Sequence, residues 1–187
     1  IRLSLVGSEM CIRDRAEGAD AVMLSAETAS GEYPLEAVQM MSKIIRQVET
    51  GPDYQTQLDV SRPQAEATVS DAISCAIRRV CSILPVAVLV NYSESGSSTL
   101  RAARERPSVP ILNLTPNLAT ARRLTVAWGV HSVVNDRLRQ VDEVCATALE
   151  IAQAQGLAKR GDTVVITTGV PFGQPGTTNS LRVETLL

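Results

Sequence analysis

Two hydroxyl-rich segments and one glycine-rich segment hold the residues whose types and spacing suit chemistry. The most distinctive is a serine-rich stretch over residues 91–98, directly before a segment with helical spacing. Hydroxyls and free backbone N–H groups at a helix N-terminus suit a phosphate group, because the helix dipole and the unpaired donors favour an anion. The candidate phosphate-binding residues are Ser93, Ser95, Gly96, Ser97 and Ser98. Serine also caps helices without any ligand, so the spacing alone leaves simple N-capping as the alternative.

Charged residues near this stretch give evidence both for and against an anion site. Arg101 and Arg104 follow in the expected helix and add positive charge, whereas Glu94 counts against an anion. The stretch is not a Walker A loop, because it lacks the Gly-Lys-Ser/Thr ending. It therefore suits a phosphate group other than that of a P-loop nucleotide.

A long loop rich in glycine and proline, residues 169–179, follows a later apolar run. Loops of this kind often bind ligands or close over them. Gly173, Gly176 and Thr177 are its candidate ligand-binding residues, and the loop contains no Lys or Arg. The alternative is a surface connection that turns the chain before an antiparallel edge strand.

A third candidate follows the apolar run over residues 20–25, which suits a strand buried on both faces. Ser25-Ala26-Glu27-Thr28 would then lie at the carboxyl end of a parallel strand and face a substrate. The alternative is a turn in which Glu27 or Thr28 satisfies local amides.

The elements that must position these residues alternate between strand and helix. The apolar patterns predict strands over 20–25, 86–90, 110–114, 130–134, 163–168 and 180–185, and helices over 34–49, 65–82, 97–105, 117–127 and 141–156. Short connections in such an alternation predict an α/β fold with a mostly parallel sheet and helices on both faces. Ligands of such sheets gather at the carboxyl ends of the strands. Residues 51–62, flanked by Gly-Pro and Arg-Pro, indicate a linker.

Composition excludes several classes of protein. A formal net charge of −2 and only one Trp, three Tyr and one Phe argue against a nucleic-acid-binding surface. No apolar run reaches the roughly 18 residues of a membrane-spanning helix. The four cysteines form no Cys-x-x-Cys pair and His131 is the single histidine, so a zinc cluster is not expected. His131 is interpreted as structural, and Cys75, Cys81 and Cys145 as buried thiols.

The first fifteen residues show no periodicity that continues into the next element. Leu5 to Asp14, within the segment 1–15, resembles a translated transposase adapter of the kind used in sequencing libraries. The segment is therefore interpreted as an artefact and excluded from fold reasoning. The natural chain is expected to enter at Ala16, with its true beginning lost.

Residues 18–38, with the sequence GADAVMLSAETASGEYPLEAV, closely resemble the last strand, loop and helix of the catalytic barrel of the pyruvate kinase family. Four later segments resemble the C-terminal domain of that family: those that begin RERPSVPIL, ATAR, GDTVVI and GTTNSLRV. The resemblance implies the last βα unit of a TIM barrel over 16–50, a linker over 51–62 and a C-terminal domain over 63–187. That domain is expected to be a three-layer α/β/α structure with a five-stranded, mostly parallel sheet and an antiparallel last strand.

For activity, the resemblance implies phosphoryl transfer from phosphoenolpyruvate to ADP, with Mg²⁺ and K⁺. The family's threonine on the last barrel strand maps onto Thr28, where it contacts substrate and assists protonation through water. The catalytic lysine, the metal-binding Glu and Asp and the potassium ligands have no counterparts in this chain, so no metal ligand is expected and the chain alone is expected to be inactive. The barrel remnant is also expected to expose an apolar face.

For regulation, the resemblance places an effector phosphate at the serine-rich stretch and implies a cytoplasmic homotetramer. The final loop lacks the second cationic partner that a bisphosphate needs, which favours a sugar monophosphate or AMP, or no effector. Two hypotheses follow: a truncated pyruvate kinase, or a free-standing module that binds a phosphorylated metabolite. A pure scaffold protein is a weaker third, because three glycine- or serine-rich loops gather where a sheet binds ligands.

Overall fold

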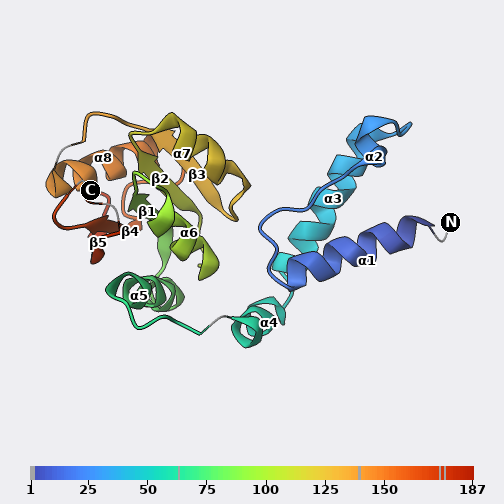
Figure 1. Ribbon diagram of the computed structural model, residues 1–187, viewed down its shortest axis with the longest axis horizontal. Coiled ribbons are helices and arrows are strands. Elements are labelled where there is room, and N and C mark those ends of the chain that lie inside the picture. Colours follow the sequence, from blue (N-terminus) through green and yellow to red (C-terminus); the bar gives the residue numbers. More distant parts are fainter. Residues whose placement is uncertain (1–2, 63, 139, 173, 175) are drawn as a thin grey trace. The chain divides into compact units, whose positions relative to one another are not determined.

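The computed structural model describes residues 3–62, 64–138, 140–172, 174 and 176–187. The chain forms two compact units, Ile1–Pro63 and Gln64–Leu187, which are coloured from blue to red along the sequence in Figure 1. The regular structure of the first unit is helical, whereas the second unit contains a β-sheet.

The first unit is helical throughout its regular structure. Its elements are α1 (Leu3–Ala16), α2 (Ala26–Ala29), α3 (Pro34–Glu49) and α4 (Tyr54–Ser61). Helix α3 begins with Pro34 in the first turn, as predicted, because proline needs no N–H donor there. Helix α4 lies in the segment that we interpreted as a linker, and its Tyr54 and Leu58 are 4% and 5% exposed. The i,i+4 spacing of these two apolar residues was the helix signal that the flanking Gly-Pro and Arg-Pro pairs obscured.

The predicted strand over residues 20–25 is wrong. The segment 21–25 is irregular, and Met23 is 84% exposed. A parallel strand needs hydrogen-bonding neighbours, and within the described residues of this unit no strand lies beside the segment. Part of the apolar surface of α3 is likewise uncovered, with Leu35 65% and Val38 50% exposed, whereas Met41 is buried.

Helix α1 forms where we predicted no element. Its Arg13 and Arg15 lie in the last turn, where positive charge favours the helix dipole. Arg15 is 6% exposed, forms an ion pair with Glu49 of α3 and donates to the carbonyl oxygen of Ala19 at 2.5 Å. The α1 segment is thus tied to its own unit by a nearly buried arginine.

The second unit contains the predicted sheet. Its strands are β1 (Val86–Tyr92), β2 (Ile111–Thr115), β3 (Val130–Val134), β4 (Thr163–Gly169) and β5 (Thr178–Thr185). They lie in the order β3-β2-β1-β4-β5, and all neighbouring pairs are parallel except β4 with β5. The mostly parallel sheet with an antiparallel last strand is therefore confirmed. The order reverses between β1 and β4, which makes the carboxyl ends of these two strands a switch point of the topology.

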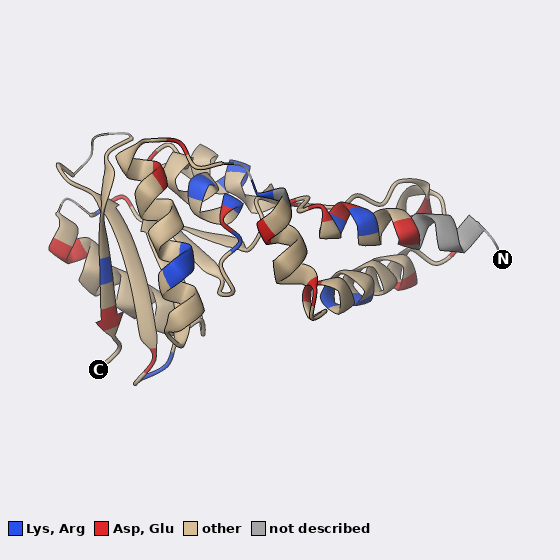
Figure 2. Cartoon of the chain, turned by 90° about the horizontal axis from the view of Figure 1, so that it is seen from below, with Lys and Arg blue, Asp and Glu red and all other residues tan. Residues whose placement is uncertain are grey.

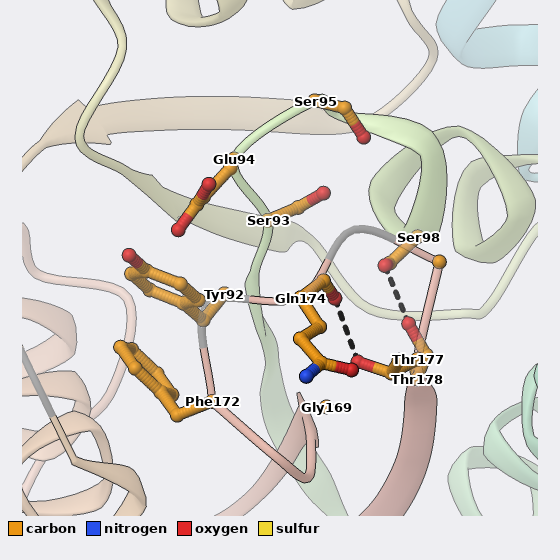
Figure 3. Close-up of a pocket in the computed structure, with 11 residues that line it drawn as sticks. Tyr92, Ser93, Glu94, Ser95, Ser98, Gly169, Phe172, Gln174, Thr177 and Thr178 are labelled. Carbon is orange, nitrogen blue, oxygen red and sulfur yellow. Dashed lines mark hydrogen bonds between the residues drawn. The ribbon is translucent and has the colours of Figure 1, made fainter.

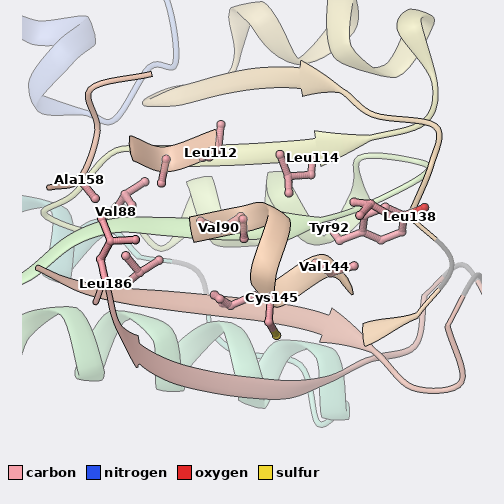
Figure 4. Close-up of a cluster of buried hydrophobic side chains, with 14 residues drawn as sticks. Val88, Val90, Tyr92, Leu112, Leu114, Leu138, Val144, Cys145, Ala158 and Leu186 are labelled. Carbon is pink, nitrogen blue, oxygen red and sulfur yellow. The ribbon is translucent and has the colours of Figure 1, made fainter. Parts of the chain in front are cut away.

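Helices cover both faces of the sheet (Figure 1). They are α5 (Val69–Ile83), α6 (Ser97–Arg104), α7 (Leu118–Arg123) with a short 3₁₀ turn (Leu124–Val126), and α8 (Val141–Ala154). Helix α8 packs on one face through Val144 and Ala148, which join Val88 and Val90 of β1 in the larger core (Figure 4). Helices α5 and α6 cover the other face, where Ile77 is 1% exposed. The three-layer arrangement follows from strands that are apolar on both faces.

A row of polar side chains crosses the sheet on the α6 face. Thr167, Asn91, Asn113 and Ser132 are register partners on β4, β1, β2 and β3. Asn113 accepts from Thr99 of α6 at 2.8 Å and donates to Ser132 at 3.2 Å. Neither side-chain amide atom of Asn91 has a hydrogen-bond partner in the described part of the chain, although the residue is 1% exposed.

Charged residues of both signs are interspersed along each unit (Figure 2). Among the residues that the structure describes, no helix combines the length and the apolar character needed to cross a membrane.

Candidate functional site

A pocket lies at the switch point of the sheet, at the carboxyl ends of β1 and β4. The β1–α6 loop supplies one wall, and the β4–β5 loop supplies the other (Figure 3). The empty space within it, about 350 Å³, includes volume that is open to solvent. The described lining residues are Tyr92, Ser93, Glu94, Ser95, Ser98, Gly169, Phe172, Gln174, Gly176, Thr177 and Thr178.

The serine-rich wall is shaped by hydrogen bonds within the loop. The hydroxyl of Ser93, 5% exposed, accepts from the N–H of Gly96 at 3.0 Å. The hydroxyls of Ser95 and Ser97 lie 3.1 Å apart. Gly96 has φ +83°, a left-handed conformation that favours glycine, and α6 begins at the next residue. The structure therefore brings the predicted Ser93, Ser95 and Ser98 to the pocket, with Gly96 and Ser97 as the turn between them.

The glycine-rich wall is joined to the serine-rich wall by a direct contact. Ser98 Oγ and Thr178 Oγ1 lie 2.5 Å apart (Figure 3). Thr177 donates to the carbonyl oxygen of Gln174 at 2.7 Å. Gly176 and Thr177 line the pocket as predicted, whereas Gly173 lies outside the described residues.

An aromatic pair closes one side of the pocket. The rings of Tyr92 and Phe172 are 4.5 Å apart between centroids and tilted by 33° (Figure 3). Glu94 lies at the same end of the pocket in this view. Six described lining residues were not among the predicted site residues: Tyr92, Glu94, Gly169, Phe172, Gln174 and Thr178. All six lie within the two segments, 91–98 and 169–179, that the sequence indicated as candidates.

The two arginines that we expected to add charge at the pocket point elsewhere. Nη2 of Arg104 lies 2.9 Å and Nε of Arg101 3.6 Å from Oδ1 of Asp71 in α5, as ion pairs rather than aligned hydrogen bonds. The backbone N–H of Glu66 donates to Asp71 at 2.8 Å. This N–H and the guanidinium of Arg104 hold the pKa of Asp71 below its ordinary value, against the effect of burial. The two arginines therefore join α6 to α5 instead of serving a ligand.

Thr28 belongs to the first unit, and every residue of the pocket belongs to the second. It lies in the short helix α2, is exposed, and donates to the carbonyl oxygen of Ser25 at 3.2 Å. The carboxylate of Glu27 accepts from the N–H of Ser25 at 2.9 Å, and backbone N–H donors lower its pKa. The predicted turn chemistry is present in this segment.

The remaining candidates are His131 and the cysteines, which we interpreted from the sequence as structural. His131 is exposed, and its Nε2 lies 3.2 Å from Oε1 of Gln155. The four cysteines are free; Cys81 and Cys145 are buried, and Cys75 is half-buried rather than buried as predicted. Among the described residues, no group of three or more His, Cys, Asp or Glu is arranged to hold a metal ion.

Comparison with known proteins adds the family. Residues 71–184 match the family described as "Pyruvate kinase, alpha/beta domain". The chain is 45% identical over 167 residues to a pyruvate kinase of Methylorubrum extorquens, a match that covers 89% of this chain and 35% of that protein. It is 38% identical over 170 residues to a pyruvate kinase of Geobacillus stearothermophilus, covering 91% of this chain and 29% of the relative.

The chain thus spans about a third of the length of the relatives it matches. The family match extends from the first turn of α5 into the last strand β5, so it contains both walls of the pocket. Sequence similarity and the architecture of the sheet agree, and the chain belongs to the pyruvate kinase family.

Proposed function

We propose that the pocket at the β1–β4 switch point binds a small phosphorylated metabolite, a sugar monophosphate or AMP, as a regulatory ligand of a pyruvate kinase. The observation that carries this proposal is the convergence of the hydroxyls of Ser93, Ser95 and Ser98 at the start of α6. Hydroxyls and unpaired N–H groups at a helix N-terminus favour a phosphate.

Charge in the pocket supports a monophosphate over a bisphosphate. The described lining residues include no Lys or Arg, and they include the carboxylate of Glu94. A second phosphate would lose water without gaining a cationic partner. Glu94 and Gln174 are instead suited to accept from sugar hydroxyls.

Calorimetric titration of the 187-residue chain tests this proposal. We expect heat with ribose 5-phosphate or AMP, and at least tenfold weaker binding of fructose 1,6-bisphosphate. The double replacement Ser95→Ala and Ser97→Ala should weaken binding by about tenfold, as expected for losing hydrogen bonds to a charged group. Ser82→Ala, at an exposed serine that donates to the carbonyl oxygen of Arg79, is the matched control. Preference for the bisphosphate, or no binding of any of the three ligands, would contradict the proposal.

For the whole protein, we propose the activity of the family: phosphoryl transfer from phosphoenolpyruvate to ADP, giving pyruvate and ATP, with Mg²⁺ and K⁺. The support is the 45% identity to a pyruvate kinase over 89% of this chain. The relatives extend well beyond the matched third, and we propose that the catalytic lysine and the metal ligands lie in the remainder. We further propose a cytoplasmic homotetramer, as the resemblance implies.

Within that enzyme, we propose that Thr28 contacts substrate and assists protonation of the enolpyruvate through water. Its exposed hydroxyl donates a hydrogen bond to the carbonyl oxygen of Ser25, and the oxygen lone pairs of this hydroxyl remain available to accept a hydrogen bond from water. A coupled pyruvate assay on this chain with phosphoenolpyruvate, ADP, Mg²⁺ and K⁺ should show no turnover. Turnover would refute the proposal that the catalytic lysine and the metal ligands lie outside this chain. In a complete enzyme that contains this segment, Thr28→Val should lower kcat more than it changes KM.

A further inference from the structure

The serine-rich loop, residues 93–98, rests on helix α7. The hydroxyl of Thr120 donates to the carbonyl oxygen of Glu94 at 2.9 Å. Nη2 of Arg123 donates to the carbonyl oxygen of Ser95. Two successive carbonyls of the loop are therefore taken by side chains of one neighbouring helix, 26 and 28 residues further along the chain.

The direction of these carbonyls matters for an anion. A backbone loop attracts a phosphate when its N–H groups face the ligand and its C=O groups face away, because carbonyl oxygens repel the anion. Donors on α7 hold the carbonyls of Glu94 and Ser95 on the α7 side of the loop. The left-handed Gly96 then turns the chain into α6, with so little room that an added Cβ would lie 3.2 Å from Cγ2 of Thr120.

Arg123 carries a positive charge beside a pocket whose described lining residues include no cationic side chain. Arg101 and Arg104 are committed to Asp71, and the described residues that line the pocket include no Lys or Arg. Arg123 is exposed, and one N–H of its guanidinium donates to the carbonyl oxygen of Ser95. A guanidinium carries five N–H donors, so this hydrogen bond uses one of the five. Its guanidinium donates directly to the backbone of the loop, so its positive charge lies beside the loop although its side chain does not line the pocket.

We propose that Thr120 and Arg123 are positioning residues of the phosphate loop, and that Arg123 supplies the positive charge that the pocket walls lack. The inference rests on the proposed function, because it assigns how that same site attracts a phosphate. It places the electrostatic contribution on α7, whereas the sequence pattern placed it on α6. Neither residue is assigned contact with the ligand.

The test compares four forms of the 187-residue chain: wild type, Arg123→Gln, Arg123→Lys and the control Arg122→Gln. Arg122 is the exposed neighbour of Arg123 on the same helix, so its replacement removes an equal charge away from the loop carbonyls. Binding of ribose 5-phosphate is measured by calorimetry at low and high salt, and the melting temperature is followed by Trp128 fluorescence. Thr120→Val, which removes the donor to Glu94, is measured alongside.

We expect Arg123→Gln to weaken binding about tenfold at low salt with little change in melting temperature. Arg123→Lys should recover most of the affinity, and the affinity difference between wild type and Arg123→Gln should shrink at high salt because the charge is screened. Arg122→Gln should bind like wild type. A structural role alone would not produce recovery by lysine or a salt-dependent difference.

The outcomes separate this inference from the proposed function. If wild type binds ribose 5-phosphate and Arg123→Gln binds equally well, the inference fails and the proposed function stands. If wild type binds neither ribose 5-phosphate nor AMP, both fail. If Arg123→Gln also lowers the melting temperature, the test depends on Arg123→Lys. If Arg123→Lys binds ribose 5-phosphate as weakly as Arg123→Gln does, the proposed role of the positive charge is overturned. A loss with Arg122→Gln as large as with Arg123→Gln also overturns it.

Discussion

Among the described residues of the sheet unit, Asp71 has the least exposed charged side chain, so its replacement by asparagine is a sharp test of how α5 and α6 are joined. Asp71 is 0% exposed, while the side chains of Arg101 and Arg104 are 33% and 31% exposed. Removing one member of a fully buried pair costs about 3–5 kcal/mol. The loss should be smaller here for two reasons. The two arginines are partly exposed, so water can solvate them when the carboxylate is removed, and the side-chain oxygen of an asparagine can still accept from the N–H of Glu66. We therefore expect Asp71→Asn to lower the free energy of unfolding by about 2 kcal/mol at pH 7.

The pH dependence of this effect has a definite sign. The pKa of Asp71 is lowered below its ordinary value of 3.8, first by the N–H of Glu66, so folding is favoured by the ionised form. The contribution is present above about pH 4 and is lost as pH falls through the lower, folded-state pKa. The difference between wild type and Asp71→Asn should be equal at pH 7 and pH 5, and should shrink at pH 3.

Urea unfolding followed by Trp128 fluorescence measures this difference. Trp128 is the only tryptophan of the chain, lies in the sheet unit, and has the guanidinium carbon of Arg106 5.2 Å from its ring centroid. Asp142→Asn is the control, because Asp142 is 94% exposed and its pair with Arg182 should contribute less than about 1 kcal/mol. Equal urea midpoints for wild type and Asp71→Asn at pH 7 would refute the reasoning, as would a difference that stays constant down to pH 3.

Two further predictions concern the loop and a thiol. Gly96→Ala should lower stability by about 1–2 kcal/mol and weaken ribose 5-phosphate binding at least tenfold, because the left-handed φ of +83° and the 3.2 Å approach to Thr120 both resist a Cβ. Gly129→Ala, at φ +67° with nothing within 4 Å, should lower stability alone, and weaker binding in this control would contradict the argument. Burial raises the pKa of Cys81 to about 11, so only about a thousandth of it is thiolate at pH 8. Iodoacetamide labelling read by mass spectrometry should therefore modify half-buried Cys75 well before Cys81, and equal rates would show that Cys81 is accessible.

The sheet was predictable because its strands are short apolar runs bounded by turn residues. The bounds of β3, Val130–Val134, agree with the predicted strand at both ends. The run over residues 20–25 is also short and apolar at its centre, and it forms no strand. An apolar run reports a preference for burial, whereas a strand also needs a neighbour to receive its hydrogen bonds.

The site was predictable where it is local in sequence. Ser93 to Ser98 form one loop, and their hydroxyls and their place before a helix are visible in the sequence. The contact of Ser98 with Thr178 joins residues 80 positions apart, and no local pattern indicates it. The same limit explains the error on Arg104, whose partner Asp71 lies one helix and one strand earlier in the chain.

The row of Thr167, Asn91, Asn113 and Ser132 across the sheet has a consequence for how the strands align. If one strand slipped by a single residue, its amide or hydroxyl would turn from the α6 face into the apolar layer under α8. A slip of two residues would set Asn91 against a neighbour such as Ile111 instead of Asn113. The row therefore favours the correct register. The amide of Asn91 has no hydrogen-bond partner among the described residues even in this register, and a shifted register would leave more buried polar groups without partners. Correct alignment also brings the ends of β1 and β4 level, which is what allows two loops far apart in the chain to form one pocket.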